Sequence, residues 1–579
     1  MNTLRKKYTT LTVVLCLIMV CIQYSCTKDF ADINTDPKVI NEFNVDYMLT
    51  YGLREMRVDP YGTWFYNGFT YQHRWCQFTL PGGGNNTDMN QSGNMGGTSR
   101  VGAVIPALFE TRRLISIMPQ EDQDKRKCYV AMTYVAQVYE MSKDIMLEGS
   151  RPYSEAYRGR FEGIYEPKWD TQPELLSILI TELNDAVNVL MTNKGDINQY
   201  SPGIQDVYYF GNWDNWIRLA NAIKLRIAMW YYQNQDINEA KKLIKEAAEQ
   251  SLGFWTDRKD EFWIPYTEDS GGTDVSYQNP HGARNLINFL KENNDPRLSI
   301  FFEKNSFTPE VIQLFKDNNV TIPDYIDYTN DPLYRYQGGP VSPDLGNEEK
   351  YFRFPVIAGT SYRPISYINR KFFNTYYDYS TPVADGYWCD IFLSYNEVCF
   401  HMAEAIEKGL YTGGKTAKEW YDTGVKECLW MFDKMAQRAI LLDYPGITQA
   451  DVDAYLAKPK VAYTGTQEQK IEKIAVQQWL SYYRYPNEAY VHVRRTSYPK
   501  RGSSIIAWEP FNVNGIELLA FPRRLIVREP LPGERNGDNV RAAFLNDGFT
   551  MNATDPVTLE RERVWWDKNN PSLGSGWQP

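Results

Sequence analysis

The sequence predicts a mainly α-helical protein in which pairs of helices alternate with long, loop-rich insertions. Apolar side chains recur with the 3.6-residue period of an α-helix in several separate segments. Between these segments lie tracts rich in Pro, Gly, Asn and Tyr that are much longer than ordinary connections. Helices therefore form the scaffold, and the long tracts are expected to be functional.

Four separate segments show the helical period clearly. They cover residues 128–141, 176–190, 216–230 and 471–482, with apolar residues three or four positions apart along one face. Pro173 stands just before the second segment, where a proline favours the start of a helix. Each segment predicts an amphipathic helix with one buried side.

Residues 398–410 and 417–432 carry the same period on either side of a Gly-Gly break, which predicts an antiparallel helical hairpin. Ala405 and Gly424 fall at positions where two helices pack closely, and Trp420 is expected to fill the hairpin core. Helix pairs of this kind resemble tetratricopeptide units, although the sequence repeat is degenerate.

The loop-rich tracts are long enough to carry a binding site. They cover residues 60–100, 255–285, 320–390 and 496–579. Loops of this length inside a compact domain are usually functional.

Composition indicates one large globular unit. The chain has 579 residues, of which 43% are hydrophobic and 23% charged, so it can bury a substantial core. No Pro/Gly/Ser-rich linker or run of charge divides it. We expect a signal peptide over residues 1–25 and a single domain over residues 26–579.

The N-terminus has the features of an export signal. Basic residues at 5–7 precede an apolar run at 11–22 that is too short to span a bilayer. The run leads to Ser25-Cys26, the pattern of a lipobox, so Cys26 is predicted to be the lipid attachment site. Ordinary cleavage that leaves Cys26 unmodified is the alternative.

Net charge limits the partners of the mature chain. The full sequence carries −10, and removing residues 1–25, which hold three basic and no acidic residues, makes it −13. Such a surface disfavours nucleic acid and anionic lipid. No other segment has the uninterrupted apolar length of a membrane span, so the lipid is expected to be the sole membrane anchor.

The number and spacing of the remaining cysteines argue against a disulfide framework or a zinc site. They are odd in number and show no C-x-x-C spacing, and we expect them to be mostly small core residues: Cys76, Cys128, Cys389, Cys399 and Cys428. No metal and no cofactor are predicted.

A concentration of aromatic residues over 61–78 is the first candidate for a ligand site. Flat rings with polar edges stack on a sugar face or an apolar side chain, while neighbouring amides bind hydroxyl groups. The predicted ligand-binding residues are Trp64, Tyr66 and Trp75, with Tyr336 as a second wall. The alternative is that half or more of these rings pack the segment onto the scaffold.

Several short motifs, taken in order, resemble those of the SusD/RagB family of outer-membrane lipoproteins. They are Asp29-Phe-Ala-Asp-Ile-Asn-Thr-Asp-Pro37, Pro152-Tyr-Ser-Glu-Ala156, Tyr165-x-Pro-x-x-Asp170, Trp216-x-x-x-Ala-Asn-x-x-Lys-Leu-Arg226, Asn294-Asp-Pro-Arg-Leu298, Ser394-Tyr-Asn-Glu-Val-Cys-Phe-x-x-Ala-Glu404, Glu488-Ala-Tyr-x-x-x-Arg-Arg495 and Pro522-Arg-Arg-Leu525. Together they span nearly the whole mature chain. Gly149-Ser150 departs from the residues that many relatives carry before Pro-Tyr.

The resemblance implies a tetratricopeptide-type scaffold and a place on the outer membrane, exposed at the cell surface. It also implies a partner, a SusC-like TonB-dependent transporter, to which the lipoprotein delivers nutrient. Relatives bind oligosaccharide or, in some cases, peptide, and the sequence leaves that choice open, with oligosaccharide favoured.

A surface-anchored hydrolase is the less favoured alternative. Glu397 and Glu404 share one helix face and could be imagined as an acid/base pair. No second catalytic feature converges on them, and Arg218, Arg226 and Arg494-Arg495 are expected to make structural contacts. The sequence therefore predicts a binding protein and not an enzyme.

Overall fold

The computed structural model describes most of the chain from residue 44 onward. The described residues are 44–57, 61–80, 100–265, 280–342, 351, 354–373, 389–439, 441, 444–513, 516–517 and 521–570. The predicted signal peptide and Cys26 lie outside these residues.

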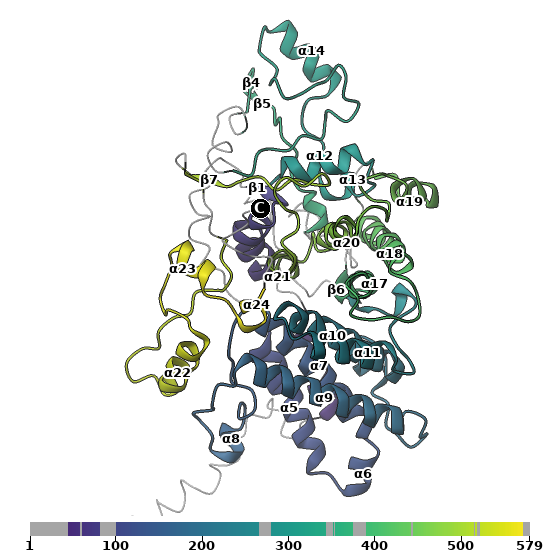
Figure 1. Ribbon diagram of the computed structural model, residues 1–579, viewed down its shortest axis with the longest axis vertical. Helices are drawn as coiled ribbons and strands as arrows, with labels where there is room; N and C mark the ends of the chain where they lie inside the picture. The colour runs from purple at the N-terminus through teal and green to yellow at the C-terminus, as the bar shows by residue number, and fades with distance from the viewer. Residues whose placement is uncertain are drawn as a thin grey trace, which may run out of the picture.

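Paired helices build the lower half of the molecule (Figure 1). α3 packs on α5, α7 on α9, and α10 on α11. The predicted helices at 128–141, 176–190 and 216–230 are confirmed as parts of α7, α9 and α10. The helices of this half are α3 (Val45–Arg54), α5 (Val101–Ser116), α6 (Gln120–Asp124), α7 (Lys127–Ile145), α8 (Gly159–Glu162), α9 (Gln172–Asn193), α10 (Trp213–Gln233) and α11 (Ile237–Ala248).

A second set of helices forms the middle and upper parts (Figure 1). α17 packs on both α18 and α20. These helices are α4 (His73–Trp75), α12 (Arg284–Glu292), α13 (Leu298–Phe301), α14 (Pro309–Asp317), α17 (Tyr395–Glu407), α18 (Ala417–Arg438), α19 (Gln449–Leu456), α20 (Gln467–Ser481) and α21 (Pro486–Thr496), preceded by the π-helix η1 (Tyr61–Gln72). Single 3₁₀ turns occur at η3 (Gly203–Gln205), η4 (Arg258–Asp260) and η7 (Arg370–Phe372).

The predicted hairpin is confirmed in α17 and α18. A Cβ atom on Gly424 would lie 2.8 Å from Cε1 of Phe400, so glycine is what lets the two helices approach. Ala405 is fully buried, as its spacing predicts. Trp420 differs from the expectation: its ring is half-buried at the edge of the core, 6.5 Å from Phe254, because its helix face turns toward the rim of the hairpin.

Side-chain caps explain where the long helices begin. Pro173 lies in the first turn of α9, as the sequence predicts, and Thr171 and Glu174 form a capping box at the start of this helix. Thr416 and Glu419 form a second box at the start of α18. The Gly-rich turn before Thr416 therefore ends one helix of the hairpin and the box starts the next.

Strands are short and antiparallel among the described residues. β1 (Thr79–Leu80) pairs with β3 (His281–Gly282), and β2 (Phe262–Pro265) with β6 (Cys389–Leu393). β4 (Val356–Ile357) pairs with β5 (Thr360–Ser361), and β7 (Asn512–Val513) with β8 (Ile516–Glu517). The mainly α fold class is confirmed.

One hydrophobic core runs through both sets of helices, from Val45 to Trp566. The C-terminal helices α22 (Gly537–Asp547), α23 (Pro556–Arg561) and α24 (Trp565–Lys568) run down one side of the molecule (Figure 1). Trp566 is fully buried and donates from Nε1 to the carbonyl of Met146 at 3.1 Å. This hydrogen bond joins α24 to the end of α7.

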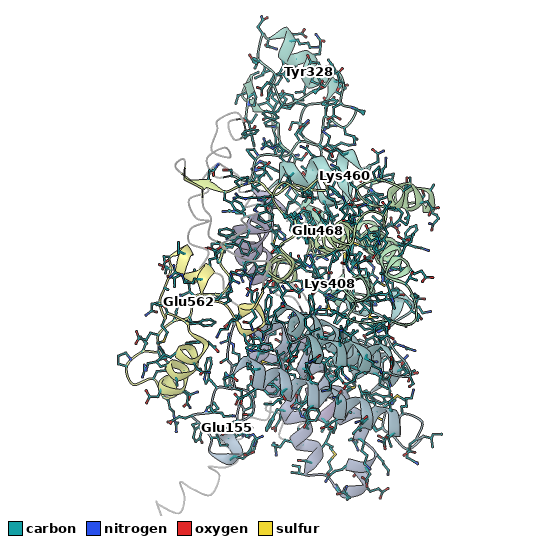
Figure 2. All side chains as sticks on the ribbon, in the orientation of Figure 1. Glu155, Tyr328, Lys408, Lys460, Glu468 and Glu562 are labelled. Atoms are coloured by element: carbon teal, nitrogen blue, oxygen red, sulfur yellow. The ribbon has the colours of Figure 1, made fainter. Side chains whose placement is uncertain are left out.

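A small second core supports a lobe that projects beyond the main body. It contains Phe307, Ile312, Phe315, Ile326 and Ile357, beside α14 and β4. Figure 2 shows Tyr328 on this lobe. The lobe combines α14, which precedes the long tract 320–390, with residues of that tract.

α9 has the length and mean hydropathy of a membrane-spanning helix, with a value of 1.3 in its most apolar window. Such a helix passes the same test when it belongs to a protein core. α9 packs on α7 and α10, and it also carries charged side chains, of which Asp185 is exposed. We therefore describe α9 as a scaffold helix.

Four of the five predicted core cysteines are buried and unpaired: Cys76, Cys128, Cys399 and Cys428. Burial raises the pKa of the Cys128 thiol to about 11. This agrees with a packing role. The side chain of Cys389 lies outside the described residues.

Candidate functional site

The predicted aromatic platform on η1 and α4 is part of the core. Trp64 is 1% exposed and donates from Nε1 to the carbonyl of Arg484 at 2.9 Å. Trp75 is fully buried, with its ring edge-on to Phe511 at 5.3 Å and Phe521 at 5.2 Å. Protein side chains cover both indoles, so the interpretation of these rings as a stacking platform is corrected.

Tyr336, the predicted second wall, gives no open ring face either. Tyr336 is 7% exposed, and its carbonyl accepts a hydrogen bond from Nζ of Lys291 at 3.2 Å. The side chain of Tyr66 lies outside the described residues. Among the described positions, the predicted set is therefore not brought together on one surface.

Both candidate catalytic carboxylates are held in buried ion pairs. Arg226 binds Glu397 with two hydrogen bonds of 2.7 and 2.9 Å, and Arg495 binds Glu404 with two of 2.8 and 2.7 Å. Burial opposes ionisation of Glu397, but Arg226 outweighs it and lowers the pKa to about 2. Carboxylates neutralised in this way tie helices together and do not form a general acid/base pair.

The other arginines of these motifs also make structural contacts. The Arg494 guanidinium is buried and stacks over Tyr490 at 5.0 Å and over Trp566 at 4.8 Å. Arg218 donates to Oδ1 of Asn215 at 2.9 Å on its own helix. The predicted structural role is confirmed for Arg226, Arg494 and Arg495.

A junction of five chain segments forms at the base of the projecting lobe. We call it the loop junction, made of residues 78–80, 280–284, 301–306, 335–341 and 363–369. Backbone bonds join these segments: Gly282 N–H donates to the Ser366 carbonyl at 2.9 Å, and Ser366 N–H donates to the Gln337 carbonyl at 2.8 Å. Segments far apart in the sequence are thereby fixed against one another.

Glycine at 338 makes this close approach feasible. A Cβ atom there would lie 2.5 Å from the Cα atom of Arg284, a contact with backbone that cannot move aside. At Gly339 the same atom would meet Cδ1 of Leu80 at 2.8 Å. The Gly-Gly pair after Tyr336 thus serves packing between segments.

The loop junction carries a partly exposed surface of aromatic and charged side chains. We call it the Tyr367 surface, made of Glu303, Phe354, Arg363, Tyr367 and Arg370. The Arg363 guanidinium stacks over the Tyr367 ring at 3.9 Å and donates to the Lys304 carbonyl at 2.8 Å. Arg370 donates from Nε to Glu303 at 3.3 Å.

The chemistry of this surface suits a neutral polar ligand. Tyr367 is half-buried, with His281 edge-on to its ring at 4.5 Å. Burial raises the pKa of the Tyr367 hydroxyl and lowers that of Arg363, although Arg363 remains paired with Glu303 at 3.4 Å. An ordered phenol, a carboxylate and two guanidinium groups can donate and accept hydrogen bonds here.

Sequence reasoning missed these five residues individually. Phe354, Arg363, Tyr367 and Arg370 lie within the tract 320–390, which the sequence marks as a functional loop region, whereas Glu303 precedes it. Tyr367 meets His281, and Arg370 meets Glu303, only in the folded chain. Contacts between residues so far apart in the chain leave no local pattern in the sequence.

Comparison with known proteins decides the family. A family model described as "Starch-binding associating with outer membrane", of the SusD-like type, matches residues 103–510. The chain belongs to the SusD-like family. The predicted family membership is thus confirmed, and the family description associates its members with the outer membrane.

Solved structures of SusD-like proteins share the fold. A chitin-binding protein is 21% identical with a TM-score of 0.63, covering 90% of this chain and 100% of its own. A SusD homologue from Bacteroides fragilis NCTC 9343 is 18% identical with a TM-score of 0.63, covering 91% and 100%. A chitin-binding SusD homologue from Flavobacterium johnsoniae is 18% identical with a TM-score of 0.60, covering 91% and 100%. No curated protein matches the chain significantly.

Proposed function

We propose that this chain is a cell-surface lipoprotein that binds oligosaccharide nutrient and delivers it to a SusC-like TonB-dependent transporter in the outer membrane. The match of residues 103–510 to the starch-binding family model carries the proposal. The helical scaffold and two structural neighbours named as chitin-binding support it further.

The route to the membrane is part of the proposal. Residues 1–25 act as the signal peptide, Cys26 receives the lipid, and residues 26–579 form one binding domain. The Cys26→Ala variant is expected to lose fatty-acid label and to leave the membrane fraction, because the lipid is the proposed anchor. A variant that stays labelled and sediments with membranes contradicts this assignment.

The Tyr367 surface is the proposed contact with sugar. Tyr367 offers a ring edge and hydroxyl, while Glu303, Arg363 and Arg370 supply hydrogen bonds to hydroxyl groups. Trp64 and Trp75 act as support for the surrounding core.

Titration of a glycan and peptide panel, followed by product analysis, tests the function. We expect saturable binding of an oligosaccharide without turnover. Binding of peptide alone identifies the chain as a peptide-capturing member, and release of products identifies a surface hydrolase. Co-purification of the tagged lipoprotein with a TonB-dependent transporter tests the delivery step.

A further inference from the structure

A groove of about 600 Å³ lies between α5, α7 and α9, with α6 at one end. These helices belong to the lower half of the molecule, whereas the loop junction lies at the base of the projecting lobe (Figure 1). Ile115, Ala131 and Val189 give it apolar walls. Glu182 and Asp185, one turn apart on α9, also line it. The groove thus combines an apolar channel with two carboxylates.

A chain of hydrogen bonds fixes the Glu182 carboxylate. Arg112 donates from Nη2 to Oε1 of Gln137 at 2.5 Å, and Gln137 donates from Nε2 to the Tyr153 hydroxyl at 2.6 Å. Tyr153 then donates to Oε2 of Glu182 at 2.5 Å. Each donor is ordered by the one before it, so Glu182 is held in one position.

The basic groups that line the groove, Arg112 and Lys127, have hydrogen-bond or ion-pair partners of their own, and Arg112 also lies near enough to Glu182 to lower its pKa. Arg112 stacks over Tyr134 at 4.2 Å and donates to Thr133 at 3.1 Å. Lys127 pairs with Asp124 at 3.0 Å. Within the part of the chain that the structure describes, neither carboxylate of α9 in the groove makes an ion pair, and Oε1 of Glu182 accepts no hydrogen bond.

We propose that this groove is a second binding site, which takes a primary ammonium group on an aliphatic stem, as in the lysine side chain of a peptide. The ammonium lies between Glu182 and Asp185, and the methylene groups lie along Ile115, Ala131 and Val189. Charge complementarity selects this ligand, because a long side chain can bury its stem while its charge meets a carboxylate.

The site has a predictable pH dependence. Burial raises the pKa of Glu182 to about 7, although the Tyr153 hydroxyl and Arg112 pull it down, and Asp185 adds to the rise. The Arg112 guanidinium is also faced by the titratable groups Tyr134 from α7 and Tyr153. Since an ammonium group binds the ionised carboxylate, affinity falls about tenfold per pH unit below pH 7 and levels off above it.

Calorimetry or NMR titration of the mature chain with the blocked tripeptide Ac-Ala-Lys-Ala-NH₂ tests the proposal. Ac-Ala-Nle-Ala-NH₂, which lacks the charge, is the matched ligand control. The variants are Glu182→Gln, Asp185→Asn and, as a control in another groove, Glu246→Gln. Thermal melting checks that each variant folds.

We expect the lysine peptide to bind at least tenfold more tightly than the norleucine peptide, and Glu182→Gln to remove that preference and its pH dependence. Asp185→Asn weakens binding about threefold, Glu246→Gln leaves it unchanged, and oligosaccharide titrations do not respond to any of the three. Equal binding of both peptides, unchanged affinity in Glu182→Gln, or no saturation by the lysine peptide up to about 10 mM overturns the proposal.

Discussion

The helical scaffold and the loop junction are held together by different means. In the scaffold, α7, α9, α10, α17 and α18 pack through side chains placed by a helical period, with ion pairs such as Arg226–Glu397 between helices. In the loop junction, backbone groups from five distant segments bond to one another, and Gly338 permits their approach. The scaffold gives stability, and the loop junction presents side chains.

Breaking the buried Arg226–Glu397 pair is expected to have one of the two largest effects on stability. Arg226→Ala leaves a buried carboxylate without its partner, so the free energy of unfolding falls by about 3–5 kcal/mol. Chemical denaturation measures this loss. Lys418→Ala, which breaks an exposed pair with Asp422, is the control and is expected to cost less than about 1 kcal/mol. Equal losses in both variants contradict the account.

Replacing Trp75 and Trp420 by alanine compares a fully buried tryptophan with a half-buried one. Trp75→Ala is expected to lower the free energy of unfolding by about 3–5 kcal/mol, because it empties a fully enclosed site. Trp420→Ala is expected to cost about 1–2 kcal/mol, because its ring is half-buried at the rim. Denaturation curves of both variants under the same conditions compare them. A larger loss at Trp420 reverses this comparison.

The close approach of two segments at Gly338 can be tested by substitution. Gly338→Ala is expected to lower stability by about 1–3 kcal/mol, since the added methyl group meets the backbone of Arg284. Gly359→Ala is the control for backbone strain. Its φ is +80°, but a Cβ atom there has no neighbour, so this variant introduces strain without crowding. Hydrogen exchange at Gly282 and Ser366 checks whether the loss is local. Unchanged exchange there contradicts the proposed crowding.

The scaffold could be predicted because its information is local. Residues 128–141 and 417–432 show their buried faces within a few turns of helix, and the Gly-Gly break lies directly between the two helices of the hairpin. Trp420 shows the limit of this method, since spacing places a residue near a face but does not say how far the partner helix extends.

The aromatic cluster was misinterpreted for a physical reason. Residues 61–72 form a π-helix, whose i→i+5 hydrogen bonds turn side chains through a different angle from that of an α-helix. The absence of a 3.6-residue period in this segment therefore did not mean an irregular, exposed loop. Burial of Trp64 and Trp75 follows from contacts with residues more than 400 positions away, such as Arg484 and Phe511.

The Tyr367 surface could not be predicted residue by residue, because Tyr367 meets His281 and Arg370 meets Glu303 only after five segments have come together. The tract 320–390 could be marked as functional from its length alone. Its individual contact residues needed the fold.

The most direct test compares Tyr367→Ala with Trp75→Ala in calorimetric titrations with the tightest-binding oligosaccharide of the panel. We predict that Tyr367→Ala weakens binding by about 1–3 kcal/mol with a small change in melting temperature, because its ring lies on the surface. Trp75→Ala is predicted to melt much earlier while its folded fraction binds normally. Normal binding by Tyr367→Ala, together with lost binding by folded Trp75→Ala, contradicts the placement of the ligand site at the loop junction.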